Sequence, residues 1–148
     1  MRDDAHLIFR RYLDAMGLNG LAMAEAAGLN TTDWYALSVL DETGPLTSGT
    51  LAERTGLTTG ATTRLIDRLE RAGHARRVAD PSDRRKVLVE HVPNLDVETI
   101  VGPSRRHLAE VLRRYTPEQL DLLFDFFERA APALHAATAE VRGAARGR

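Results

Sequence analysis

Hydroxyl and guanidinium side chains gather in the stretch 57–92 of this 148-residue chain. Hydroxyl groups can reach phosphates or base edges in a DNA groove, and an arginine can bond guanine through two hydrogen bonds. We therefore expect this stretch to bind double-stranded DNA. The candidate contact residues are Thr58, Thr59, Thr63, Arg64, Arg77, Arg84, Arg85 and Lys86.

The threonines belong to a predicted amphipathic helix. Thr58 or Thr59 can cap its start and Gly73 can end it. At about 100° per residue, the apolar face holds Ala61, Thr62, Leu65, Ile66, Leu69 and Ala72. The opposite face begins with Gly60, Thr63 and Arg64. That first turn is small, hydroxylated and basic, as a major-groove contact requires, although a solvated helix in any α+β domain has the same pattern.

The basic residues after this helix belong to a predicted β-hairpin. Its tip reads Asp80-Pro81-Ser82-Asp83-Arg84-Arg85, and the β-branched run 87–92 follows. Such a turn can straddle a DNA backbone, and arginine suits a narrow minor groove. The arginines can also pair with the two aspartates of the tip. Because the two arginines are adjacent, an extended arm would point one inward to a carboxylate and the other outward.

The sequence contains no motif for catalysis or for metal binding. The five histidines show no i, i+4 pair, and the chain has no cysteine. A metal site would therefore need ligands from distant positions, and disulfides and thiol sensing are excluded. No serine lies in a nucleophile elbow. The sequence predicts no enzyme, no metal and no cofactor.

The charge distribution favours nucleic acid more than the net charge does. The whole chain has a formal net charge of −1. Residues 57–92 hold eight basic and five acidic residues, a net of +3, which leaves 12 basic and 16 acidic residues elsewhere. A local basic surface on a nearly neutral chain is common in DNA-binding domains. No apolar run could span a membrane and no signal-peptide core follows residues 1–4, so we expect a cytoplasmic protein.

Helices are predicted on both sides of this stretch. Before it, a helix at 3–27 stops at Gly28, a second is capped by Thr31 or Thr32 and runs to about residue 42, and a third is capped by Thr47 or Ser48 and ends at Gly56. After it, Pro93-Asn94 opens a fifth helix that Gly102-Pro103 should kink or split. The sequence Thr116-Pro117-Glu118-Gln119 starts the last helix, in which Pro132 should cause a bend.

Four runs of sequence together resemble one known family. They are Gly44-Pro45-Leu46-Thr47, the stretch 51–58, the stretch 63–73, and the tip at 80–85. In this order and spacing they are similar to the MarR family of winged helix-turn-helix regulators, over roughly residues 32–92. The Asp-Pro-x-Asp-Arg-Arg tip is the most specific part.

The resemblance implies a mainly α fold with a small β-hairpin wing, in which a winged helix-turn-helix lobe at 32–92 is flanked by dimerisation helices at 3–28 and 94–145. It also implies a homodimer on an inverted-repeat operator, usually a repressor, that a small-molecule effector releases. By resemblance, Arg85 is the wing arginine expected to project. Candidates to line the family's ligand pocket are His6, Arg10, Trp34, Tyr35 and His107. The alternative is a helical ligand-binding or protein-interaction module that no longer binds DNA.

Overall fold

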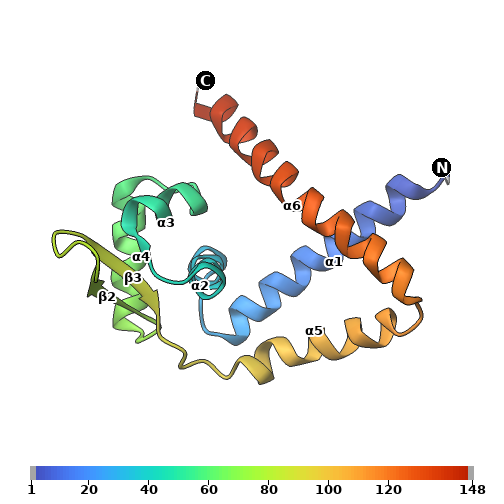
Figure 1. Ribbon diagram of the computed structural model, residues 1–148, viewed down its shortest axis with the longest axis horizontal. Helices are drawn as coiled ribbons and strands as arrows, with labels where there is room; N and C mark the ends of the chain where they lie inside the picture. The colour runs from blue at the N-terminus through green and yellow to red at the C-terminus, as the bar shows by residue number, and fades with distance from the viewer. Residues whose placement is uncertain (1–2, 147–148) are drawn as a thin grey trace. The chain divides into compact units, whose positions relative to one another are not determined.

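The computed structural model describes residues 3–146 and confirms a mainly helical chain with a small antiparallel sheet (Figure 1). The chain divides into two compact units, of which the first runs to Val101 and the second starts at Gly102. The elements in order are α1 (Ala5–Ala26), α2 (Thr31–Thr43), β1 (Leu46–Thr47), α3 (Ser48–Thr55), α4 (Thr59–Arg71), β2 (Ala75–Ala79), β3 (Val87–His91), α5 (Val97–Leu112) and α6 (Pro117–Arg146).

The core of the first unit lies among α2, α3, α4 and the sheet. Its largest fully buried side chains include Leu40, Leu51, Leu65, Ile66, Leu69 and Val89. Burying each such side chain favours folding by about 1.5–3 kcal/mol. The predicted apolar face of α4 is thus confirmed in its middle, while Ala72 is exposed because it is the C-cap, beyond the last packed turn.

Side-chain caps set where the helices of this unit begin. Thr47 caps α3 by accepting the Thr50 N–H, as the sequence predicts. The prediction that Thr31 or Thr32 caps α2 is wrong, since the Asn30 side chain accepts the N–H of Asp33. Asparagine is at least as good an N-cap as threonine, so the helix begins one residue earlier than a threonine cap would allow.

Three strands form the sheet, in the order β1-β3-β2, with both pairings antiparallel. The wing pairs Ala75 with His91 at its base and Ala79 with Val87 near its tip. The short β1 adds Leu46 opposite Val89. Because Val89 is buried against α4 and its neighbours, the wing is anchored at its base and extends away from the core toward its tip (Figure 1).

Helix α5 begins later than expected and is not split at Pro103. Helix α5 begins at Val97, because the Asp96 carboxylate accepts the Thr99 N–H and so caps the helix three residues later than Pro93-Asn94 predicts. Pro103 does not split α5; it removes one backbone donor, and the hydrogen bonds on either side keep the helix continuous.

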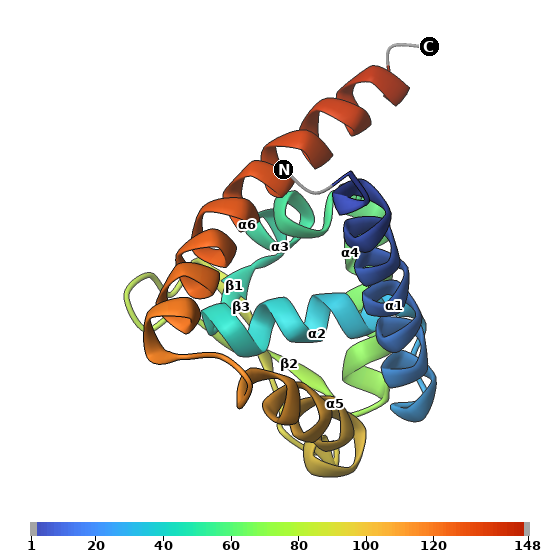
Figure 2. The same cartoon turned by 90° about the vertical axis from the view of Figure 1, so that its right-hand side faces the viewer.

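Helix α6 begins as predicted, with the Gln119 N–H donating to Thr116 and the Thr116 N–H donating to the Gln119 side chain. It then runs for 30 residues through Pro132 as one helix (Figure 2). Among the residues described, no helix is both long and apolar enough to cross a membrane.

Candidate nucleic-acid interface

Helices α3 and α4 form a helix-turn-helix joined by a tight turn. Gly56 ends α3 in the left-handed region with φ 67°, a conformation that suits glycine because it has no Cβ. The Leu57 N–H then donates to the Ala52 carbonyl, and the Leu57 side chain packs against the core. The Thr58 hydroxyl accepts the Ala61 N–H at 3.3 Å and starts α4. The turn therefore fixes the angle at which α4 presents its first residues.

The first two turns of α4 present the predicted contact residues to solvent. Thr58, Thr59, Thr63 and Arg64 are all exposed. The Thr63 hydroxyl donates to the Thr59 carbonyl at 3.0 Å, which leaves its oxygen free to accept a hydrogen bond. The Arg64 guanidinium lies above Gly60, 3.8 Å from the place where a Cβ would be. This surface is small and basic.

Thr62 shows why burial matters on this helix. It is 1% exposed, and its hydroxyl donates to the Thr58 carbonyl at 3.0 Å. The sequence prediction that Thr62 lies on the buried face of the helix is confirmed. The outward hydroxyl of the second turn is therefore that of Thr63 alone.

The wing tip is organised by its two aspartates. Asp80 accepts the Ser82 N–H at 2.7 Å and the Ser82 hydroxyl at 2.6 Å, and these hydrogen bonds lower the pKa of the Asp80 carboxyl. The Lys86 N–H donates to the Asp83 carbonyl at 2.8 Å and closes a turn. The Asp80 carboxylate therefore accepts its hydrogen bonds from Ser82 within the turn and not from an arginine.

The same turn changes the expectation for Arg84 and Arg85. They lie in the turn and not on an extended arm, so the argument from alternating strand sides does not apply. Arg85 projects with its side chain 94% exposed, while its Nε lies 3.6 Å from Asp83. Lys86 Nζ lies 3.9 Å from the same carboxylate. Arg84 is exposed as well, so all three cations are available at the tip.

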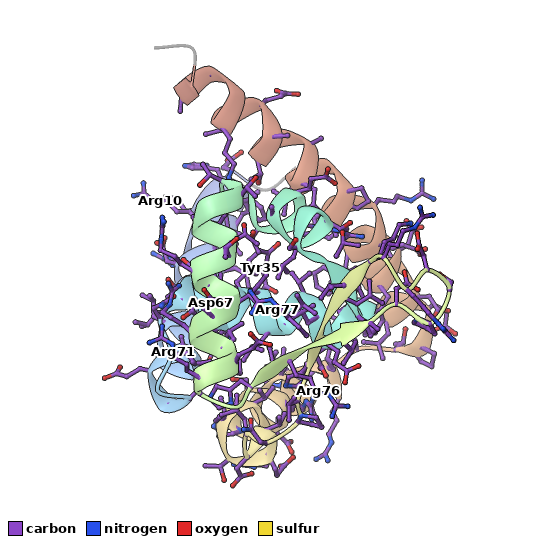
Figure 3. The ribbon with its side chains drawn as sticks, turned by 90° about the vertical axis from the view of Figure 1, so that its left-hand side faces the viewer. Arg10, Tyr35, Asp67, Arg71, Arg76 and Arg77 are labelled. Atoms are coloured by element: carbon purple, nitrogen blue, oxygen red, sulfur yellow. The ribbon has the colours of Figure 1, made fainter. Side chains whose placement is uncertain are left out.

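Arg77 differs from the other candidates because carboxylates of α4 hold it. Its Nη2 donates to Asp67 at 2.8 Å and its Nη1 donates to Glu70. The Arg77 backbone N–H also donates to Glu70, at 2.8 Å. Figure 3 shows the guanidinium between wing and helix. The hydrogen bond that Arg77 donates to Asp67 is the largest cause that raises the pKa of Arg77. Its role as a DNA contact stays a prediction.

The sequence did not indicate the role of Arg68, another arginine of α4. Arg68 donates to Asp33 of α2 through Nε at 2.9 Å and Nη2 at 2.6 Å, a two-pronged pair. Asp33 is 3% exposed and also accepts from the Asn30 side chain at 2.9 Å. The two partners are 35 positions apart. No local pattern could have paired them.

A cavity of about 330 Å³ lies between α1 and α2. Both helices belong to the first unit. Trp34 and Tyr35, two of the predicted ligand-pocket residues, line it. The other candidates do not: His6 and Arg10 lie nearer the start of α1, and His107 belongs to the second unit. Within residues 3–146, no group of three or more His, Cys, Asp or Glu side chains could hold a metal ion.

Known proteins resemble this chain in sequence and in fold. The MarR family model matches residues 27–86. The uncharacterized HTH-type transcriptional regulator YcgE of Bacillus subtilis is 38% identical over 126 residues, which cover 84% of this chain and 82% of YcgE. A MarR-like regulator of Thermotoga maritima is 25% identical with a TM-score of 0.63, covering 90% of this chain and 98% of that one.

A further solved structure supports the fold alone. The MepR protein of Staphylococcus aureus has a TM-score of 0.74 at 17% identity, covering 90% of this chain and 99% of MepR. The helix-turn-helix, the basic wing and these similarities agree: the chain belongs to the MarR family of helix-turn-helix transcriptional regulators.

Proposed function

We propose that this protein is a homodimeric repressor that binds an inverted-repeat operator in double-stranded DNA and leaves it when a small molecule binds. The observation that carries the proposal is the exposed first face of α4, with Thr63 and Arg64 directed to solvent. Backbone N–H groups at Thr58–Gly60 form the start of the helix, where phosphate binding is favoured. Arg64 then reads a guanine, and Thr63 contacts a neighbouring base edge.

The wing supplies the flanking contact. Arg84, Arg85 and Lys86 present three positive charges on a turn that Asp80 and Asp83 hold in shape. A narrow A·T-rich minor groove has an enhanced negative potential and attracts such side chains. The lobe at 32–92 is thus the proposed DNA-binding part.

Exposed apolar side chains support the homodimer. On α1 they are Leu7, Ile8, Phe9, Leu13, Met16 and Leu21, and on α6 they are Leu122, Phe124, Phe126, Phe127, Leu134 and Val141. Monomeric proteins rarely expose large continuous apolar patches. We therefore assign residues 3–28 and 94–145 to dimerisation. Release by a small molecule is supported by the cavity that Trp34 and Tyr35 line.

The test is binding to a labelled duplex taken from the DNA upstream of the protein's own gene. A regulator should protect an inverted repeat in a footprint, and its affinity should fall steeply as salt rises, because counterions are released on binding. A module that no longer binds DNA should give no protected site and equal, weak binding to an unrelated duplex. Arg64→Ala should need a higher protein concentration to protect the same site. Arg129→Ala on α6 is the matched control.

A further inference from the structure

Two aspartates of this chain are followed by an arginine four residues later on the same helix, and the two arginines behave differently. On α6, Arg129 Nε donates to both carboxylate oxygens of Asp125, at 2.9 and 3.0 Å. On α4, Arg71 Nε donates to the backbone carbonyl of Asp67 at 3.2 Å and not to its carboxylate. An acid four residues before a base normally pairs with it on a helix surface. Another contact on α4 therefore prevents the usual pair.

That contact comes from the wing. Arg77 of β2 donates to the Asp67 carboxylate at 2.8 Å and also to Glu70. Asp67, Arg71 and Arg77 lie together on this part of the first unit (Figure 3). The carboxylate is thus already paired with a cation of another element, and among residues 3–146 Arg71 forms no ion pair. Arg71 is exposed, and both of its Nη groups are available.

Arg71 lies on the same face of α4 as Arg64. The seven residues between them correspond to about 10 Å along the helix axis and a rotation of about 20°. A major groove is about 12 Å wide, and a recognition helix contacts base edges with its N-terminal residues. A side chain about 10 Å further along the helix than Arg64 therefore reaches the rim of the groove, where the phosphates lie. A guanidinium can bind a phosphate through two parallel hydrogen bonds.

We propose that Arg71 contacts a phosphate at the rim of the major groove, and that Arg77 keeps Arg71 available by occupying the Asp67 carboxylate. This inference rests on the proposed function, because it adds a contact to the DNA-binding face of α4. Arg77 is then a positioning residue that acts on DNA through Arg71. When Arg77 is removed, the Asp67 carboxylate pairs with Arg71 and holds it away from DNA.

The other arginine of this face does not compete for Asp67. The Arg64 guanidinium lies above Gly60, one turn toward the start of the helix, and so points away from Asp67. A pair in which the acid precedes the base is also the more favourable order on a helix. Asp67 precedes Arg71 and follows Arg64, so its partner in the absence of Arg77 is Arg71.

The salt dependence of DNA binding measures the phosphate contact. Full-length protein is titrated into the labelled footprinted duplex and into an unrelated duplex over a salt series. Arg71→Ala should lower the salt slope by about one unit and weaken binding to both duplexes by the same factor, because every sequence carries phosphates. Arg71→Lys keeps the charge and should keep the slope. Arg129→Ala removes the arginine of the matched pair on α6 and should leave the slope unchanged.

The role of Arg77 is tested by restoring the slope. Arg77→Ala should also lower the slope by about one unit, because Asp67 then pairs with Arg71. The double variant Arg77→Ala with Asp67→Asn should regain that unit. Both variants lack the contact between Arg77 and α4, so the difference between them isolates the Asp67 carboxylate. With Arg71→Ala added to each, the difference should disappear. A thermal melt checks that every variant folds.

The outcomes separate the inference from the proposed function. An unchanged slope in Arg71→Ala, or a loss confined to certain sequences, would overturn the phosphate contact. If Asp67→Asn restores nothing, or restores the slope equally when Arg71 is absent, the role of Arg77 is overturned. A wild-type protein that binds neither duplex would overturn the proposed function itself, and the inference would fall with it.

Discussion

The Arg77 guanidinium of β2 donates to the Asp67 carboxylate of α4 at 2.8 Å. This contact joins the middle of the wing strand β2 to the helix that carries Arg64. Glu70 holds the same guanidinium and also accepts the Arg77 backbone N–H. These contacts hold the wing at a fixed position and orientation relative to α4. The wing and α4 can bind one DNA site together only if the distance between them matches the spacing of the DNA grooves.

Arg77 should act on DNA binding through this geometry. If it positions the wing, Asp67→Asn and Arg77→Ala should both weaken operator binding, although the first removes a negative charge. Since the Arg77 side chain is 36% exposed, the pair contributes only about 0–1 kcal/mol to folding, and thermal stability should change little. Fluorescence anisotropy over a salt series measures the effect. Tighter binding by Asp67→Asn, with a lower salt slope for Arg77→Ala, would instead make Arg77 a phosphate contact.

Arg64 should supply base preference. Arg64→Ala should cost about 1–3 kcal/mol in operator affinity and relax the preference at one base pair of each half-site. Competition among duplexes that differ at single positions measures this. A loss of equal size on every sequence would show that Arg64 contacts phosphate instead.

The sequence predicted the elements better than the contacts between them. The helix-turn-helix and the wing follow from local signals, such as the Thr47 cap and the glycine at 56 with φ 67°. The cap at Asn30 was missed because three neighbouring residues could all serve and only packing selects one. The cap at Asp96 was missed because a proline-asparagine pair is an equally good local start.

Contacts over long separations could not be predicted. Arg77 looked like another exposed wing cation, and only the folded chain brings Asp67 and Glu70 to it. Arg68 carried no signal, since its partner Asp33 is 35 positions away. An arginine on an exposed face can bind DNA or a carboxylate, and the sequence pattern is the same in both cases.

The cations of the wing tip should strengthen operator binding without stabilising the fold. The Arg85 side chain is 94% exposed and its ion pair with Asp83 is long, at 3.6 Å. Ala at Arg84 or at Arg85 should lower the salt slope of operator binding by about one unit each and leave the melting temperature nearly unchanged. If Ala at both positions changed neither affinity nor its salt dependence, the wing would have no role in binding.

The oligomeric state should depend on α6. Sedimentation at micromolar concentration should give a dimer, since Leu122 is 71% and Phe126 52% exposed in one chain. Placing a charge at such a site, as in Phe126→Glu, should give a folded monomer with lost operator affinity, because desolvating a carboxylate opposes association. Asp121→Asn on the same helix is the control. A monomeric wild type would contradict the assignment of α6 to dimerisation.

Removing either partner of the Asp33–Arg68 pair should destabilise the fold, and the two losses should differ in size. Arg68→Met leaves a carboxylate that is 3% exposed without its cation, and breaking a buried pair in this way costs about 3–5 kcal/mol. Asp33→Leu leaves an arginine whose side chain is 43% exposed and which water can solvate, so its cost should be smaller. Urea unfolding measures both. Equal costs for the two single variants would mean that water reaches Asp33 once Arg68 is gone.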